Sequence, residues 1–217
     1  MFDFDTLKRF RNPFTHWVGD AVPYETVLAI NEAWPTEQGP QWMKERGKFA
    51  NKDSLLFPAR LPAPAQDLAA EMYSPAMCRQ LSDLVGIELQ PDPWFLEGPA
   101  RPALGGGLHE IHPGGLLKMH IDFNRHPTGL VRCLNLLIYL NLNWETGWSG
   151  ALELGATREQ RIWPVAGRAV IFETTPDSWH GHPVPLICPP GVTRRSLALY
   201  YYTRSANADR PTTVYQR

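Results

Sequence analysis

The sequence predicts a mainly β fold with N-terminal helices, in which helices buttress a jelly-roll core. Two observations predict it. Residues 105–204 contain eight short segments rich in β-branched, aromatic or leucine residues, most of them separated by Gly, Pro or Asn. Residues 1–100 instead contain helical stretches between proline-rich loops. No charged or flexible linker divides the halves, so we expect one domain over residues 1–217, with residues 1–100 as a helical buttress and lid.

Two helices are expected in the N-terminal half. Residues 24–34 form a helical stretch between two prolines. Residues 75–85 form a second stretch, in which Ser74 is placed as the N-cap and Gly86 as the C-cap. Two proline-rich segments are interpreted as linkers, namely 61–64 and 91–93.

The C-terminal half carries the predicted strands. Each is four to twelve residues long and is bounded by turn-forming residues. They are residues 107–112, 117–122, 131–142, 150–154, 161–164, 168–173, 178–184 and 194–203. So many short strands in about 100 residues favour two packed sheets or a closed barrel.

Composition excludes several classes of protein. The net charge of −1 argues against a nucleic-acid binder, because such proteins carry a basic stripe. No apolar run approaches the roughly 20 residues that cross a bilayer, and the N-terminus lacks the apolar stretch of a signal peptide. Three cysteines without C-x-x-C spacing indicate separate reduced thiols in a cytoplasmic protein. The expected partner is a small molecule or a peptide, and the oligomeric state is left open.

The triplet His120-Ile121-Asp122 indicates a metal site. Side chains two apart in a strand share a face, so His120 and Asp122 project together. Two histidines and one carboxylate on one side of the metal hold iron in non-haem Fe(II) oxygenases. His180, within the predicted segment 178–184, is the candidate third ligand. The triplet alone also fits an exposed strand with a surface histidine and aspartate.

The last predicted strand has one face that suits an anion. Arg194, Ser196, Ala198 and Tyr200 share this face, where small side chains leave a hollow beside a guanidinium. Arginine donates paired hydrogen bonds to a carboxylate, so the hollow suits a dicarboxylate. We assign Arg194 to the site and Arg195 to the surface. The alternative is that both arginines are solvated charges at the strand end.

The central strand, 131–142, also splits into two faces. Alternate positions from Leu134 are continuously apolar, whereas the opposite face carries Asn135 and Tyr139. Polar groups in a buried strand need hydrogen-bond partners, and a bound dicarboxylate would supply them. The alternative for Tyr139 is a bond to a backbone carbonyl.

The order of these elements resembles a known family. The stretches MHIDF, LLIYLNLNW, GALEL, RAVIFETT, SWHGHPV and TRRSLALYYY, between about residues 105 and 204, resemble the 2-oxoglutarate/Fe(II) oxygenases of the prolyl-hydroxylase-like branch. The resemblance implies a double-stranded β-helix with His120, Asp122 and His180 as iron ligands. It further implies that Arg194 and Tyr139 bind the distal carboxylate of 2-oxoglutarate, with Ser196 completing an R-x-S pattern.

The roles of two histidines stay open in this resemblance. His182 stands where an apolar residue is usual, and its side chain faces either apolar packing or the metal. His112 stands where some relatives have a pocket-lining tyrosine, so its role is open. The intact Asp122 disfavours a halogenase, because those relatives lack the carboxylate.

The resemblance implies a dioxygenase that uses Fe(II), 2-oxoglutarate and O2 and releases succinate and CO2. We expect it to hydroxylate a small polar metabolite, an amino acid (proline-like) or a peptide. Candidate substrate contacts are His112, Arg125, Trp148, His182 and Tyr200. The rival is a non-redox, cupin-like jelly roll that binds a metal or a sugar, but such a protein needs no arginine beside a small-residue hollow.

Overall fold

A curled antiparallel sheet forms the body of the molecule in the computed structural model, which describes residues 1–36, 39–96, 102–205 and 210–216. Its strands are β1 (Lys8–Phe10), β2 (His16–Asp20), β3 (Trp42–Arg46), β4 (Ala50–Leu55), β5 (Gln90–Pro91), β6 (Gly107–Ile111), β7 (Leu116–Ile121), β8 (Val131–Tyr139), β9 (Leu152–Leu154), β10 (Gln160–Ile162), β11 (Arg168–Glu173), β12 (His180–His182), β13 (Arg194–Thr203) and β14 (Val214–Tyr215). The helices are α1 (Tyr24–Glu32), α2 (Ala63–Met72), α3 (Pro75–Val85) and α4 (Pro93–Leu96). The predicted jelly-roll class and all eight predicted strands are confirmed, most with slightly shorter bounds.

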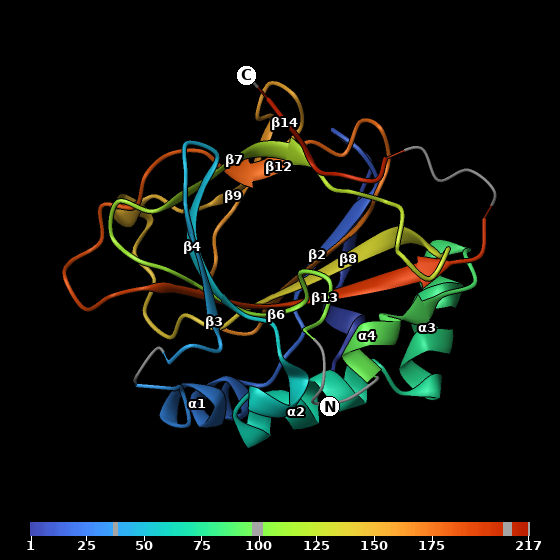
Figure 1. Cartoon of the computed structure of the whole chain (residues 1–217), viewed down its shortest axis with the longest axis horizontal. Helices are drawn as coiled ribbons and strands as arrows, with labels where there is room; N and C mark the ends of the chain where they lie inside the picture. Colours follow the sequence, from blue (N-terminus) through green and yellow to red (C-terminus); the bar gives the residue numbers. More distant parts are fainter. Residues whose placement is uncertain (37–38, 97–101, 206–209, 217) are drawn as a thin grey trace.

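The sheet has two layers that meet through β4. The order along it is β1-β2-β11-β8-β13-β6-β4-β7-β12-β9-β10. Strand β4 pairs with β6 through residues 53–55 and with β7 through residues 50–51, so it bends from one layer into the other. In Figure 1, β8, β13 and β6 lie below, and β7, β12 and β9 lie above.

The helices cover the outer face of the lower layer (Figure 1). Leu134, Leu136 and Ile138 of β8 and Leu197 and Leu199 of β13 are fully buried against helical side chains. The opposite faces of β8 and β13 therefore point between the layers. None of the helices in the described ranges is long and apolar enough to cross a membrane.

Helix α3 confirms the predicted caps. The Ser74 hydroxyl accepts a hydrogen bond from the Met77 amide at 3.3 Å, and Gly86 ends the helix at φ +73°. A left-handed residue at this position satisfies the last carbonyl groups, and glycine adopts it without steric cost. The predicted helix 24–34 is observed as α1, two residues shorter.

Three expectations for the N-terminal half are wrong. Residues 61–64 are not a linker, because α2 begins at Ala63, and prolines in a first helical turn lose no hydrogen bond. Residues 91–93 are not a linker either, because Pro91 ends β5 and Pro93 begins α4. Residues 1–100 also hold five strands, of which β2 pairs with β11 and β4 enters the central sheet. Residues 97–100 of the expected buttress lie outside the described residues.

Candidate metal and cosubstrate site

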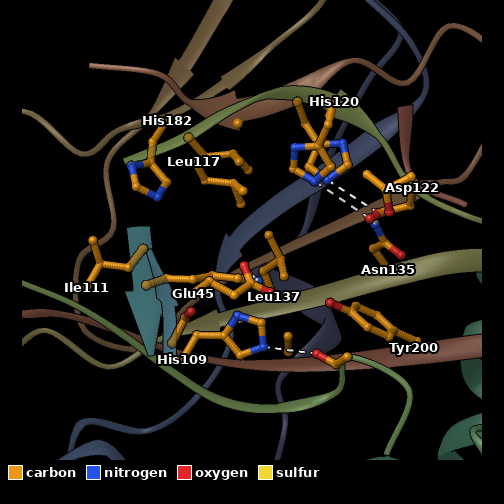
Figure 2. Close-up of a pocket in the computed structure, with 18 of the residues that line it drawn as sticks. Glu45, His109, Ile111, Leu117, His120, Asp122, Asn135, Leu137, His182 and Tyr200 are labelled. Carbon is orange, nitrogen blue, oxygen red and sulfur yellow. Dashed lines mark hydrogen bonds and ion pairs between the residues drawn. The ribbon is translucent and has the colours of Figure 1, made fainter. Parts of the chain in front are cut away.

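His120 and His180 face each other across two paired strands. His120 on β7 and His180 on β12 are direct partners in the antiparallel register. Asp122 follows β7 and turns to the same side, with its Oδ1 3.6 Å from His120 Nε2 and its Oδ2 3.3 Å from His180 Nε2. The three ligand atoms lie within 4.8 Å of one another, and all three residues are buried (Figure 2). The structure therefore brings the three predicted metal ligands together.

Backbone carbonyls orient both imidazoles. His120 Nδ1 donates to the Lys118 carbonyl at 2.8 Å, and His180 Nδ1 donates to the Ser178 carbonyl at 2.9 Å. A proton on Nδ1 leaves the Nε2 lone pair free for a metal. Burial, followed by the nearby His180 ring, lowers the pKa of His120, which favours its neutral, ligating form. Two such imidazoles and one carboxylate are a donor set that fits Fe(II).

The carboxylate of Asp122 is held by two side chains of β8. Arg132 Nη2 donates to Asp122 Oδ2 at 2.9 Å, and Asn135 Nδ2 donates to the same oxygen at 2.7 Å. Asn135 Oδ1 in turn accepts from Arg132 Nε at 2.7 Å. Burial by itself would raise the pKa of Asp122, but the Arg132 guanidinium and the His180 ring hold this pKa well below its usual value. Asp122 is therefore a carboxylate at neutral pH.

Asn135 has a different neighbourhood from the one expected. We expected it to contact the cosubstrate, whereas both ends of its amide group are bonded to Asp122 and Arg132. Arg132, 1% exposed, was not expected in the site at all. A bulge in β8 is the reason: Tyr201 pairs with Leu134 but Tyr202 pairs with Arg132. The extra residue between them moves Arg132 onto the pocket face and breaks the alternation.

Arg194 lies at the other end of the site. Its Nε donates to the Gly150 carbonyl at 2.7 Å, and its Nη2 lies 3.3 Å from the Tyr139 hydroxyl. Arg194 is 5% exposed, and its hydrogen-bond partners among the described residues include no carboxylate. Ser196 and Ala198 line the cavity beside it. A buried arginine without a counter-ion fits an anionic ligand, because an unpaired buried charge is costly.

Arg195 points the other way. Its Nε donates to Glu110 Oε1 at 3.1 Å, and its Nη1 donates to Asn31 Oδ1 of α1 at 3.0 Å. The guanidinium also lies 4.4 Å from the ring centre of Trp34. The structure therefore places Arg194 in the cavity and packs Arg195 against the helical layer.

One cavity of about 200 Å³ joins the metal triad to Arg194. Of the five predicted substrate contacts, His182 and Tyr200 line it. His112 lies outside, because it follows the end of β6 and its Nε2 pairs with Asp53 Oδ2 at 3.1 Å. Arg125 is an exposed loop residue, and Trp148 packs on Trp144 with ring centres 5.6 Å apart. These three residues therefore do not line the cavity, because loop residues near a strand end turn outward as readily as inward.

Other lining residues come from segments that the sequence analysis did not place near the site. Glu45 and Lys52 belong to the β3–β4 hairpin, and Tyr215 belongs to β14. The Tyr215 ring lies 5.5 Å from the His120 ring and 4.7 Å from the Phe49 ring. His109 of β6 also lines the cavity, and its Nε2 donates to the Gly105 carbonyl at 2.9 Å. The alternation of Gly107, His109 and Ile111 was the available signal for His109.

Gly181 allows β12 to lie close to β7. A methyl group at this residue would lie 2.8 Å from the carbonyl oxygens of both Leu117 and Lys118. Gly181→Ala is therefore expected to push β12 away, to weaken Fe(II) binding about tenfold or more and to lower stability by about 2 kcal/mol. Metal titration and thermal unfolding check this. Gly147→Ala is the control, since nothing lies within 4 Å of an added methyl group there; equal metal affinity in both variants contradicts the expectation.

Comparison with known proteins agrees with this geometry. Residues 106–202 match the family model described as the 2OG-Fe(II) oxygenase superfamily. The structure is similar to a prolyl-4-hydroxylase of Pseudomonas putida, with 18% identity, a TM-score of 0.60, and coverage of 85% of this chain and 89% of that one. HygX of Streptomyces hygroscopicus, solved with nickel and 2-oxoglutarate bound, has 12% identity, a TM-score of 0.56, and coverage of 99% and 94%. The viral collagen prolyl hydroxylase of Paramecium bursaria Chlorella virus-1 has 14% identity, a TM-score of 0.53, and coverage of 84% and 92%.

No curated protein sequence matches the chain. Fold, site and family model together define a metal-dependent jelly-roll enzyme rather than a cupin-like binder. Over residues 106–202 the chain is similar to the 2OG-Fe(II) oxygenase superfamily, which points to a dioxygenase that depends on Fe(II) and 2-oxoglutarate. Its fold is that of the prolyl hydroxylases, so the expected resemblance is confirmed.

Proposed function

We propose that the protein is a hydroxylase in which His120, Asp122 and His180 hold Fe(II). Arg194 and Tyr139, with Ser196 beside them, would hold the distal carboxylate of 2-oxoglutarate. The substrate would be a small polar metabolite, an amino acid (proline-like) or a peptide, and the products would include succinate and CO2. The observation that carries this proposal is that one cavity contains both the triad and a buried arginine that pairs with no carboxylate of the described residues.

The residues of the chain have separate tasks in this proposal. Iron with 2-oxoglutarate and O2 supplies the oxidising chemistry. Lys118 and Ser178 carbonyls orient the two imidazoles, and Arg132 keeps the Asp122 carboxylate charged. Arg194 orients the cosubstrate, and the apolar walls around Leu137 and Leu152 exclude water.

We further infer that the enzyme acts as one domain over residues 1–217, since α1 and α2 share the core of the sheet. A reducing, cytoplasmic setting is supported by the three buried thiols of Cys78, Cys133 and Cys188, which form no disulfide. Binding of nucleic acid is not part of the proposal, because the net charge is −1.

An anaerobic visible spectrum tests the proposal. Metal-free protein is titrated with Fe(II) and then with 2-oxoglutarate, and a charge-transfer band is expected only when both are bound. Slow conversion of 2-oxoglutarate to succinate in air, without any substrate, is the second readout. His112→Ala is the matched control, because this histidine lies outside the cavity and should leave both signals unchanged. If the folded wild-type protein shows no charge-transfer band and forms no succinate, the proposal is overturned.

Arg194→Met is expected to raise the 2-oxoglutarate concentration that half-saturates the band by about a hundredfold, because it removes paired charge-assisted hydrogen bonds. Iron binding should be unchanged, since Arg194 contacts Gly150 and Tyr139 rather than the triad. Arg195→Met is the comparison, because its guanidinium lies on the outer face. If Arg195→Met raised the required 2-oxoglutarate concentration more than Arg194→Met, the assignment of Arg194 to the cosubstrate would be wrong.

A further inference from the structure

Two opposite charges of the β3–β4 hairpin face the cavity. Glu45 and Lys52 are direct partners in the antiparallel register, and both line the cavity that holds the triad. Lys52 Nζ lies 3.9 Å from Glu45 Oε2, which is too far for a hydrogen bond. Within the described part of the chain, neither head group makes a hydrogen bond. Each therefore has unused hydrogen-bonding capacity and lines the cavity.

Lys52 lies well inside the cavity. Its side chain is only 15% exposed, whereas that of Glu45 is 35% exposed, so Lys52 is the deeper of the two. Strand β4, which carries Lys52, pairs with β6, which carries His109, and both side chains line the cavity. Burial, followed by the charge of Lys52, lowers the pKa of His109 to about 3. A buried lysine without a hydrogen-bond partner is costly, and an anionic ligand would offset that cost.

His182 supplies a second unused donor. Both of its ring nitrogens are buried, and neither has a hydrogen-bond partner among the described residues. Figure 2 shows the ring on the far side of Leu117 from the triad, with Glu45 on the opposite side of the cavity. Buried polar groups are nearly always paired, so an imidazole in this state indicates a polar ligand.

The cosubstrate does not account for these three side chains. In the proposed function, 2-oxoglutarate uses Arg194 and Tyr139 at one end and the metal at the other. Lys52 and Glu45 belong to β4 and β3, which carry none of the residues proposed to hold the metal or the cosubstrate, and the His182 ring lies on the far side of Leu117 from the triad (Figure 2). These three side chains are therefore available to bind the substrate, which is the molecule that is oxidised.

We propose that Glu45, Lys52 and His182 form a subsite for a substrate with a free carboxylate and a free ammonium group, as in an unblocked amino acid. Lys52 and His182 donate to the carboxylate in the deeper part, and Glu45 accepts from the ammonium group near the mouth. The ligand replaces one long ion pair with two hydrogen-bonded pairs, which are stronger. A residue inside a peptide chain has neither charge and would leave both side chains unpaired. This inference rests on the proposed function and narrows its substrate class.

The test measures 2-oxoglutarate-dependent succinate formation by the full chain loaded with Fe(II). The probes are the common L-amino acids, including proline, each supplied free, N-acetylated and as the carboxamide. At least one free amino acid is expected to accelerate turnover well above the rate without substrate. Each blocked form of that amino acid is expected to be about tenfold or more poorer in kcat/KM, because one charge-assisted hydrogen bond is lost.

Two variants connect the effect to the side chains. Lys52→Met should lower kcat/KM for the free amino acid about tenfold or more but leave the carboxamide unchanged. Glu45→Gln should likewise lower kcat/KM for the free amino acid about tenfold or more, but it should leave kcat/KM for the N-acetylated form unchanged. Neither should alter the 2-oxoglutarate requirement of turnover without substrate. Lys44→Met is the matched control, because Lys44 is an exposed lysine of the same strand as Glu45 and lies outside the cavity lining.

Several results would overturn the inference. Blocked forms that work as well as free ones, or a raised 2-oxoglutarate requirement in Lys52→Met, would show that the charges do not select the substrate. If the protein converts 2-oxoglutarate to succinate without substrate but no free amino acid accelerates this reaction, that result would reject the inference and leave the proposed function standing. Absence of both the charge-transfer band and turnover without substrate would reject the proposed function, and the inference with it.

Discussion

His180→Ala is expected to abolish turnover of 2-oxoglutarate and to weaken Fe(II) binding by at least about a hundredfold, because one of three protein ligands is lost. The ring lies directly across the strand pair from His120, with its Nε2 3.3 Å from Asp122 Oδ2. No other described His, Cys, Asp or Glu side chain groups with this pair. Metal titration and succinate formation check the result.

The position of His182 makes a second variant informative. His182→Ala should retain the iron-dependent band, because its ring is not part of the triad and lies beyond Leu117 (Figure 2). Added imidazole should partly restore the band in His180→Ala, since the lost side chain leaves a space of its own size. A His180→Ala protein that keeps full iron affinity would contradict the assignment and would point to His182 as the third ligand.

Arg132→Met is expected to destabilise the metal-free protein by about 3–5 kcal/mol, because it leaves the buried carboxylate of Asp122 without its cation. Arg132 is 1% exposed and lies over the Tyr200 ring, with its guanidinium carbon 3.3 Å from the ring centre. Denaturant unfolding at neutral pH measures the loss. Arg168→Met is the control, since Arg168 forms an outer ion pair with Asp20 that should contribute less than about 1 kcal/mol.

The pH dependence separates lost charge pairing from lost packing. The pKa of Asp122 is depressed in the folded protein, so its stabilising contribution is present above the unfolded pKa of about 4 and is lost as the pH falls through the folded pKa. The difference between wild type and Arg132→Met should therefore be largest near neutral pH and should narrow below about pH 4. A difference that stays constant with pH would mean that packing on Tyr200 carries the effect.

The local part of the fold could be predicted because its causes lie within a few residues. Ser74 and Gly86 bound α3 through contacts inside that helix, and alternation in β8 and β13 separates the helical face from the cavity face. The start of helix α2 could not be predicted from its prolines, because proline ends a helix in its interior but is tolerated in its first turn. The charged hairpin of β3 and β4 was missed because it has no regular alternation of apolar residues.

The types of residue that form the site could be predicted from the local pattern of the chain. Strand alternation places His120 and Asp122 on one side, and the small residues after Arg194 leave room beside its guanidinium. The other walls of the cavity depend on how distant strands pair in the folded protein. A bulge turned Arg132 toward Asp122, and the pairing of β4 with β6 and β7 brought Lys52 into the same cavity as the triad. Both depend on pairing between strands far apart in the chain, which no short stretch of sequence encodes.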